Sequence, residues 1–470
     1  MDAARLACLL LLLLLLSCAS AVSGSEQCVD EQGSCTASAG AIRVAKAMGM
    51  EEDFNSLHLL QTHLAGSDKK REAKLPTDPA DGLCNEPSNT AQKVSVPEVA
   101  NDADAVCNDG TPGVYYWSPA SCPNSSKWLV FLGSGGWCWD AESCSERWPS
   151  SLSSKDYPDI ETYDPDSIMG NHSPFHNYNR VYLRQCSSDA WMGDIGKNQS
   201  VGQVHWRGAR IVRATLRHLV VDRGLAEAEL LVFGGASAGA RGSMVHLDTL
   251  KKFGLVPLKL PVLGLLDSPY YIEMPSFQNL TTAKNNYNLQ TQLVAKNMHN
   301  EAILRGGGAC NLAEAWKCGF GQYRVPLLKT PFLLIDSQYD AYGIATYEGL
   351  AHWIGTQHCY PEPQGAHYSF AGAFAGRVYV GLTTLPQVVR KTSGLYSTTC
   401  NQHAESEHGV FGKQKMSGIS MADAAEQAVD AFMNPGKKMM PYVVDDTCAV
   451  LNCGQYCLSK IKADCGVGLR

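Results

Sequence analysis

The stretch Glu229-Leu230-Leu231-Val232-Phe233-Gly234-Gly235-Ala236-Ser237-Ala238-Gly239 decides the fold that this chain of 470 residues predicts. Residues 229–233 form a strand-like, mostly apolar run, and a helix-like run to about Lys252 follows Ser237. Gly235 and Gly239 flank the serine in a G-x-S-x-G pattern, which lets the backbone make the cramped strand-to-helix turn of a nucleophile elbow. The helix N-terminus would place N–H groups and partial positive charge beside the hydroxyl. A structural turn is the alternative, because small residues cluster in many turns.

Further apolar runs predict the rest of a sheet. Strand-like runs occupy residues 127–132, 180–183, 260–266 and 331–335, and a helical stretch covers 209–221. Apolar strands that alternate with helical segments indicate βαβ units and a mainly parallel sheet. Together with the elbow, this pattern predicts an α/β fold of α/β-hydrolase type, in which helices flank a mainly parallel sheet.

The composition limits the class of protein. A hydrophobic content of 45% can fill a sizeable core, which excludes global disorder. The formal net charge of −7 and the absence of a long Lys/Arg run argue against nucleic-acid binding. Eighteen cysteines are more than a reduced cytosolic protein uses, so we expect disulfide-rich loops and an oxidising compartment.

The first residues predict secretion. Arg5 precedes an apolar run over residues 6–16, and small residues follow in an A-x-A pattern, so residues 1–21 are interpreted as a signal peptide cleaved near Ala21. An uncleaved anchor is the alternative, but the run is shorter than the roughly 20 apolar residues of a membrane span, and we expect no stable span in the mature chain. Four N-x-[ST] sequons are candidates for glycosylation on the surface: Asn124, Asn171, Asn198 and Asn279.

Polarity divides the remaining chain. Residues 22–100 are predicted to be a polar extension or pro-region, and residues 101–470 to hold the hydrolase-like domain. Within the extension, apolar residues recur at helical spacing over 41–64, which predicts a short amphipathic helix. A poorly ordered extension is the alternative interpretation.

A serine nucleophile needs a base and an acid that orients it, which α/β-hydrolases supply in the order Ser, Asp/Glu, His. Asp340 lies just past the strand-like run 331–335, at the edge where such sites assemble. Asp336, at the end of that run, and Asp267, at the end of the run 260–266, are the competing acids. Spacing alone does not select the base among the later histidines, which are His352, His358, His367, His403 and His408.

Two other segments bear on the chemistry. Gly133-Ser134-Gly135-Gly136-Trp137 follows an early strand and could supply backbone N–H groups to an oxyanion, although a flexible loop is the alternative. Cys400-x-x-His403 and Cys453-x-x-x-Cys457 have the spacing of zinc ligands. Because secretory oxidation favours disulfides for these cysteines, we expect no metal and no organic cofactor.

Several segments carry a common signature in the same order along the chain. With the elbow, they resemble the pectin acetylesterase and Notum carboxylesterase family over roughly residues 105–465. The segments are Cys107-Asn108-Asp109-Gly110-Thr111-Pro112-Gly113, Gly135-Gly136-Trp137-Cys138, Asn179-Arg180-Val181-Tyr182-Leu183-Arg184-Gln185-Cys186, Ser337-Gln338-Tyr339-Asp340 and Cys400-Asn401-Gln402-His403.

This resemblance implies a role for particular residues. It implies Ser237 as the nucleophile, Asp340 as the orienting acid and His403 as the general base. It also implies an oxyanion hole from the N–H groups of Gly136, Trp137 and Ala238, and disulfides that pair Cys138 with Cys144, Cys310 with Cys318 and Cys107 with Cys186. Ala240 departs from the family, which commonly has a second glycine there, and its methyl group is expected to narrow the oxyanion side.

The resulting hypothesis is a secreted, monomeric serine carboxylic ester hydrolase that removes O-acetyl groups from a cell-wall or extracellular polysaccharide. The first alternative is a Notum-like deacylase that removes a fatty acyl group from a secreted protein. The second is a non-catalytic, hydrolase-like binding protein. A deep apolar cavity would favour lipid and a shallow cleft acetyl, and Trp137, Trp139 and Trp191 are the tryptophans expected to line it.

Overall fold

The computed structural model describes residues 84–458, except 123–124, 148, 200–202, 300, 351, 355–356, 360–362, 447–449 and 453. The predicted signal peptide, the predicted helix over 41–64 and Asn124 lie outside the described residues. All of the described residues belong to one compact unit. In the described part of the chain, no helix combines the length and the apolar character that a membrane crossing requires.

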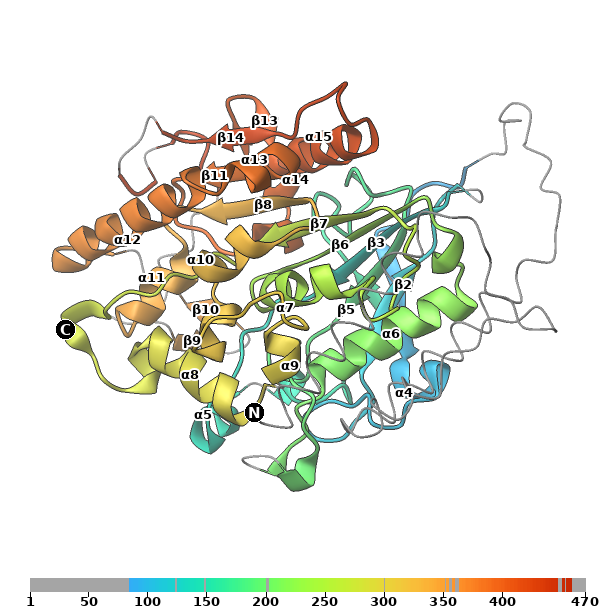
Figure 1. Cartoon of the computed structure of the whole chain (residues 1–470), viewed down its shortest axis with the longest axis horizontal. Helices are drawn as coiled ribbons and strands as arrows, with labels where there is room; N and C mark the ends of the chain where they lie inside the picture. Colours follow the sequence, from blue (N-terminus) through green and yellow to red (C-terminus); the bar gives the residue numbers. More distant parts are fainter. Residues whose placement is uncertain are drawn as a thin grey trace, which may run out of the picture. The chain divides into compact units, whose positions relative to one another are not determined.

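A ten-stranded sheet forms the centre of this unit (Figure 1). Its strands, in spatial order, are β14 (Tyr442–Val444), β11 (Gly394–Thr398), β8 (Phe332–Ser337), β7 (Val262–Asp267), β6 (Leu230–Ala236), β3 (Lys127–Leu132), β5 (Asn179–Leu183), β2 (Val114–Ser118), β1 (Thr90–Ser95) and β4 (Ile160–Thr162). All neighbours from β14 to β5 pair in parallel, whereas β2, β1 and β4 add an antiparallel edge. The mainly parallel sheet predicted from the sequence is confirmed.

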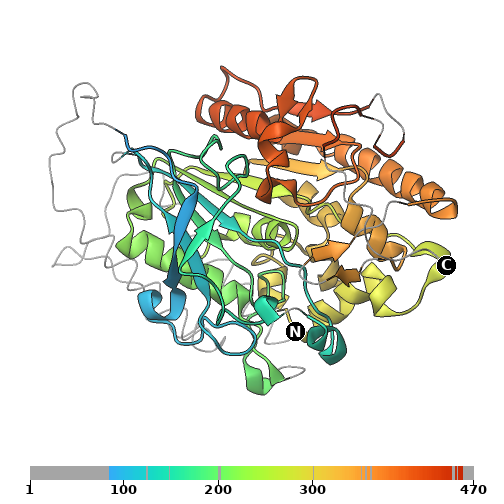
Figure 2. The ribbon, with the colours of Figure 1, turned by 180° about the vertical axis from the view of Figure 1, so that it is seen from behind.

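Helices lie on both faces of the sheet and in the loops around it. They are α4 (Val96–Ala100), α5 (Ala141–Ser145), α6 (Gly208–Asp222), α7 (Ala238–His246), α8 (Tyr287–Asn297), α9 (Glu301–Leu304), α10 (Gly321–Arg324), α11 (Ala341–Tyr347), α12 (Ala366–Thr383), α13 (Gln387–Thr392), α14 (Val410–Lys413) and α15 (Met421–Met433). Two small hairpins pair β9 (His352–Ile354) with β10 (Gln357–Cys359), and β12 (Lys415–Met416) with β13 (Ile419–Ser420). Figure 2 shows the antiparallel edge (blue) and the C-terminal elements (red) in different parts of the molecule.

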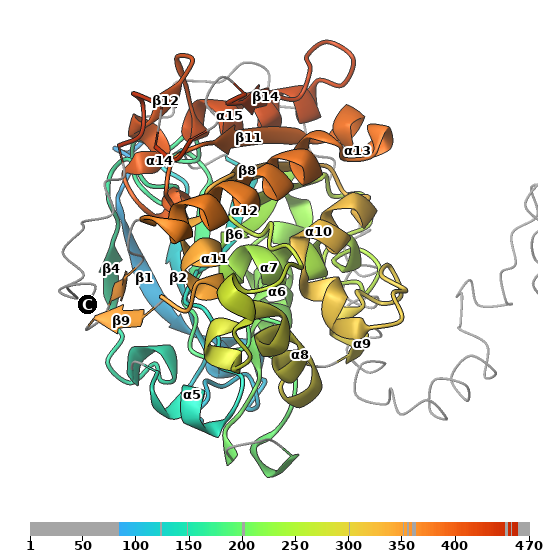
Figure 3. The same ribbon diagram turned by 90° about the vertical axis from the view of Figure 1, so that its left-hand side faces the viewer.

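Alternation along the strands explains why both faces are covered. Leu263 and Leu265 of β7 pack with α15 in the main hydrophobic core, and Gly264 between them faces the other side, against Leu247 just beyond α7. Each central strand is therefore apolar on both faces, as a sheet with helices on both sides requires. On the α7 side, α8, α9, α10 and α11 gather around α7 (Figure 3).

The fold begins earlier than the sequence pattern indicates. β1 occupies Thr90–Ser95 and pairs with both β2 and β4, although residues 22–100 are predicted as an extension. Its sequence Thr-Ala-Gln-Lys-Val-Ser is largely polar, and only Ala91 within it is buried. A strand near the sheet edge buries little surface, so it carries no apolar signal.

Five disulfides occur among the described residues. They join Cys84 to Cys122, Cys107 to Cys186, Cys138 to Cys144, Cys310 to Cys318 and Cys400 to Cys457. Three of them join the pairs that the family resemblance implies.

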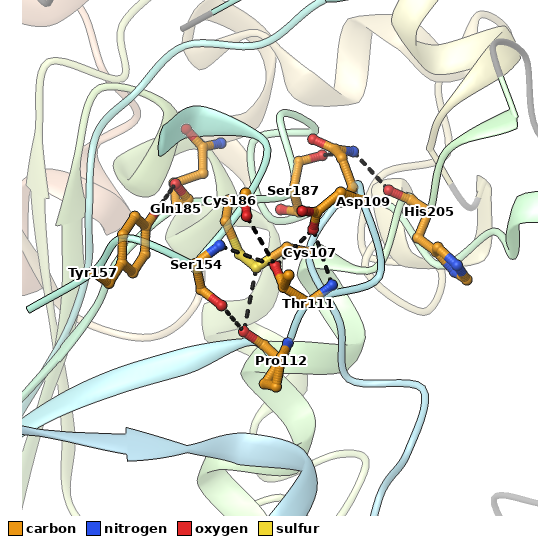
Figure 4. The surroundings of a disulfide bond; sticks show 12 residues. Cys107, Asp109, Thr111, Pro112, Ser154, Tyr157, Gln185, Cys186, Ser187 and His205 are labelled. Carbon is orange, nitrogen blue, oxygen red and sulfur yellow. Dashed lines mark hydrogen bonds between the residues drawn. A yellow bond between two sulfur atoms is a disulfide. The ribbon is translucent and has the colours of Figure 1, made fainter. Parts of the chain in front are cut away.

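The Cys107–Cys186 disulfide ties the segment before β2 to the loop after β5. Figure 4 shows the hydrogen bonds that surround it. The Asn108 side chain donates to the carbonyls of Ser187 (2.9 Å) and His205 (2.6 Å), and the Tyr157 hydroxyl donates to the carbonyl of Gln185 (2.9 Å). The cross-link thus lies among segments whose backbone carbonyls already accept hydrogen bonds from neighbouring side chains.

Loop length predicts how much two of these disulfides stabilise the fold. Cys107 and Cys186 are 79 residues apart, whereas Cys310 and Cys318 are 8 apart. In the chain-entropy account, removing the longer cross-link by the pair of Cys→Ser changes should lower the free energy of unfolding by about 2 kcal/mol more than removing the shorter one. Urea unfolding of both double variants measures the difference. Equal losses would contradict this account.

Candidate active site

The elbow at Ser237 joins β6 to α7 with a strained backbone. Ser237 has φ 51° and ψ −116°, a left-handed conformation that a side chain adopts only at a cost. Its N–H donates to the carbonyl of Asp267 (2.8 Å), which holds the turn. A Cβ on Gly239 would lie 1.8 Å from the carbonyl oxygen of Leu132, and one on Gly235 would lie 2.4 Å from the Gly239 backbone. Both glycines of the motif are therefore required by close packing.

A chain of hydrogen bonds runs from the serine to a carboxylate. Ser237 Oγ lies 2.7 Å from His403 Nε2, and His403 Nδ1 lies 2.6 Å from Asp340 Oδ2. The other Asp340 oxygen accepts from Gly343 N (2.6 Å) at the start of α11, which fixes the orientation of the carboxylate. Asp340 and His403 are 7% and 6% exposed at their side chains, so solvent screens their interaction little.

Burial and charge act in opposite directions on His403. Burial alone would lower its pKa, but the negative charge of Asp340 and the hydrogen bond to it outweigh burial and raise the pKa above its ordinary value. Tyr342 stacks on the ring at 5.2 Å between centroids and covers it. The imidazole is thereby held in one position, with Nε2 toward the serine.

The two competing acids have other partners. Asp336 accepts from Tyr270 N (2.9 Å), and burial together with the charge of Asp340 holds its pKa well above the ordinary range. Asp267 accepts from Ser268 Oγ (2.9 Å) and from Ser406 N (2.8 Å), so it anchors the loop that carries His403. Among the side chains that the structure describes, no histidine is hydrogen-bonded to either carboxylate.

Of the five candidate histidines, the structure brings His403 to the serine. His367 Nδ1 instead lies 3.3 Å from Glu348 Oε1. His408 comes later in the chain, after the loop that carries His403. His352 and His358 lie in β9 and β10, and their side chains are outside the described part of the structure. The Cys400–Cys457 disulfide anchors the segment that leads to His403, so Cys400 is not available to a metal.

The loop after β3 contributes Gly136 and Trp137 to the cavity beside Ser237. Gly135 and Gly136 have φ of 138° and 64°, which bends the loop toward the elbow. Arg147 donates to the carbonyls of Gly135 and Trp137 (3.3 Å). Because a trans peptide directs its N–H away from its carbonyl, binding of the Gly135 carbonyl turns the Gly136 N–H away from Arg147. Among the described residues, no hydrogen bond occupies the N–H of Gly136, Trp137 or Ala238.

Glu407 connects this loop to the loop of the base. Its carboxylate accepts from Ser134 N (3.0 Å), from the Ser134 hydroxyl and from the Tyr182 hydroxyl (2.7 Å). Glu407 lies four residues beyond His403 in the chain. The oxyanion loop and the base loop are therefore held by a single carboxylate.

A small cavity opens beside Ser237. It has a volume of about 10 Å³ and is lined by Gly136, Trp137, Ala190, Ser237, Ala238, Arg241, Tyr271, Tyr287 and Tyr342. Sequence reasoning missed Arg241 and the three tyrosines, because they come from different loops and helices and share no motif. Of the three tryptophans expected to line the cavity, only Trp137 does. Trp191 instead is buried and donates to the Gly133 carbonyl (3.1 Å).

Ala240 is buried and does not line the cavity, so the expected narrowing of the oxyanion side by its methyl group is not seen.

The candidate glycosylation sites differ in their exposure. Asn198 and Asn279 are exposed, whereas Asn171 is only partly exposed and its Oδ1 is enclosed.

Comparison with known sequences places this chain in a family. A sequence model described as Pectinacetylesterase matches residues 85–457. The chain belongs to the pectinacetylesterase family. The resemblance seen in the sequence is thus confirmed, over nearly all of the described residues.

Individual members of the pectinacetylesterase family match more locally. Pectin acetylesterase 7 of Arabidopsis thaliana is 27% identical over 243 residues, which cover 51% of this chain and 60% of that protein. Palmitoleoyl-protein carboxylesterase NOTUM of Homo sapiens is 28% identical over 251 residues, which cover 51% of this chain and 49% of that protein. The chain thus spans less than two thirds of both relatives.

A solved structure shares the fold. The Wnt deacylase Notum from Drosophila superposes with a TM-score of 0.62 at 21% identity, and the match covers 78% of this chain and 99% of that chain. This likeness confirms the α/β-hydrolase-like fold.

The hydrogen bonds from Arg147 to the loop after β3 lead to a testable prediction. Arg147→Met should lower kcat for an ester by about 10²-fold, because the Gly136 N–H would lose its fixed direction, and should change KM little. Affinity for a boronic acid, which mimics the tetrahedral intermediate, should fall more than affinity for the product acid. Equal losses for both ligands would show that Arg147 has only a structural role.

Proposed function

We propose that this protein is a serine carboxylic ester hydrolase in which Ser237, His403 and Asp340 form the catalytic triad. The observation that carries the proposal is the continuous hydrogen-bond chain Ser237 Oγ–His403 Nε2 and His403 Nδ1–Asp340 Oδ2, at 2.7 and 2.6 Å. It lies at a strained elbow and beside three N–H groups that are free among the described residues. Each of these features is needed for acyl transfer by a serine.

Acylation follows from this geometry. Ser237 Oγ attacks the ester carbonyl carbon while His403 Nε2 takes the hydroxyl proton, and Asp340 orients the resulting imidazolium. The carbonyl oxygen becomes an oxyanion that accepts from the N–H groups of Gly136, Trp137 and Ala238. As the intermediate collapses, His403 gives its proton to the departing alkoxide, and an acyl-serine remains.

Deacylation repeats these steps with water. His403 takes a proton from a water molecule as its oxygen attacks the acyl carbon, and the same N–H groups hold the second oxyanion. Collapse releases the carboxylic acid, and the proton returns from His403 to Ser237 Oγ. The proposed residues account for every proton, so the reaction as proposed uses no cofactor.

The size of the cavity favours a short acyl group. Small-molecule sites usually enclose about 300–1,000 Å³. The cavity beside Ser237 measures only about 10 Å³, which leaves no room for a fatty acyl chain and favours a small acyl group such as acetyl. A relative carries the name pectin acetylesterase. We therefore propose that the substrate is an O-acetylated extracellular polysaccharide and not a lipidated protein. We also propose that the enzyme is secreted and acts as a monomer.

Substitution of the nucleophile tests the proposal. Ser237→Ala should lower kcat for p-nitrophenyl acetate by roughly 10⁶-fold, toward the rate that binding and the oxyanion hole alone provide. Ser243→Ala is the matched control, because Ser243 is a buried serine of the same helix that does not line the cavity. It should retain parental activity. A Ser237→Ala variant as active as the parent would refute the serine mechanism, and an inactive parent would favour the binding-protein alternative.

The pH dependence of kcat/KM tests the acid and the base. His403 accepts a proton only when it is neutral, so activity should fall as the pH drops through its pKa, which lies above the ordinary value of about 6.5. Asp340→Asn removes the charge that raises this pKa while burial still lowers it. The acid limb should therefore move to lower pH, and kcat should fall by roughly 10⁴-fold.

Asp336→Asn is the control for this experiment. Asp336 is also buried near the end of β8, but it accepts from Tyr270 N and is not the hydrogen-bond partner of His403. Replacing it by an amide should leave the acid limb of the profile in place. An acid limb that does not move in Asp340→Asn, or that moves equally in both variants, would contradict the proposed role of Asp340.

A further inference from the structure

Arg241 is a buried arginine in the wall of the catalytic cavity. It is 2% exposed and lies one helical turn beyond Ser237 on α7, where residues four apart share a face. Four residues correspond to roughly 6 Å along a helix axis. An acyl group that extends from Ser237 along this face would therefore reach Arg241 within a few carbons.

The guanidinium is fixed by rings on several sides. Its central carbon lies 3.8 Å from the ring centroid of Trp137, 4.8 Å from that of Tyr271 and 5.6 Å from that of Tyr287. All three rings line the same cavity. Stacking on aromatic faces stabilises a desolvated cation and leaves it little freedom to swing aside.

Hydrogen bonds fix its remaining edge. Arg241 Nε and Nη2 donate to the carbonyl of Gly319 (3.1 and 2.9 Å), and Nη1 donates to the Tyr287 hydroxyl (2.6 Å). Gly319 follows Cys318, whose disulfide with Cys310 anchors that segment. The acceptors are therefore themselves immobile, and the side chain forms a rigid wall.

Nothing in the charge balance of the fold explains this arginine. No carboxylate of the described residues forms an ion pair with it. A buried cation without an anionic partner is costly to the fold. A residue retained at such a cost in the wall of a catalytic cavity points to a functional role.

We propose that Arg241 is a specificity-determining residue that closes the acyl site and restricts the enzyme to short acyl groups. This inference rests on the proposed ester hydrolase function. The side chain occupies the space that the next carbons of a longer acyl chain would need, and its anchored guanidinium cannot yield to them. It therefore explains why so small a cavity remains beside Ser237.

The acyl-chain preference of two variants tests this proposal. Arg241→Ala removes the side chain that closes the cavity. Arg241→Leu replaces the guanidinium by a shorter, apolar side chain that still lies between the rings. The p-nitrophenyl esters of acetate, butyrate, hexanoate and octanoate are the probes. The parent should prefer acetate, and the ratio of kcat/KM for acetate to that for octanoate should fall at least about tenfold in both variants, because each added methylene then gains contacts.

Arg324→Leu is the matched control. Arg324 is also fully buried, donates to the carbonyls of Met244 (3.3 Å) and Val245 (3.0 Å) in α7, and does not line the cavity. Its loss should lower the midpoint of thermal unfolding without changing the acetate-to-octanoate ratio. A change in that ratio in this control would show that loosening α7, and not opening the cavity, sets the preference.

The outcomes separate this inference from the proposed function. If the parent hydrolyses p-nitrophenyl acetate and Ser237→Ala does not, the proposed ester hydrolase function is supported. If the parent does not hydrolyse it, that function is refuted. A parent that hydrolyses octanoate as well as acetate overturns the role of Arg241 even if neither variant folds. So does an unchanged ratio in a variant whose circular dichroism spectrum matches that of the parent.

Discussion

The close approach of the elbow to the end of β3 is the constraint on which the site depends. A side chain at Gly239 would collide with the carbonyl of Leu132, so α7 can begin where it does only because that position has no Cβ. This contact sets the N-terminus of α7 directly beside the loop that follows β3. Gly136, Trp137 and Ala238 thus line one cavity with the strained Ser237 because two backbones pack together.

Hydrogen bonds hold together the loops that this close approach brings side by side. The candidate residues follow the carboxyl ends of β3, β6, β8 and β11, which is where parallel sheets of this type place their sites. Loops move more than strands, so their ends need fixing. Asp267 binds the loop of His403 to the elbow, and Glu407 binds it to the oxyanion loop. Residues outside the reaction therefore determine how accurately the reacting groups meet.

The sequence predicted the parts of this arrangement that repeat a pattern. The apolar runs that became β3, β5, β6, β7 and β8 are buried on both faces and therefore visible, whereas β1 buries only Ala91 and is not. The elbow was predictable because its glycines follow from sterics. The choice of His403 came from a family resemblance, since spacing cannot tell which loop reaches the serine. Arg147, Arg241, Glu407 and Tyr271 were missed because their roles arise only from contacts between distant segments.

In the proposed mechanism, the charges near Ser237 suit the tetrahedral intermediate better than the resting site. Asp340 is balanced only when His403 becomes an imidazolium, while burial and the charge of Asp340 raise the pKa of the nearby Asp336 carboxyl. Arg147 polarises the peptides that form the oxyanion loop, and although burial lowers its pKa to about 10, it remains charged at neutral pH. When the serine attacks, one negative and one positive charge appear together, each beside groups already oriented for it. A site that is electrostatically incomplete before attack and complete after it stabilises the transition state more than the substrate, which is the condition for catalysis.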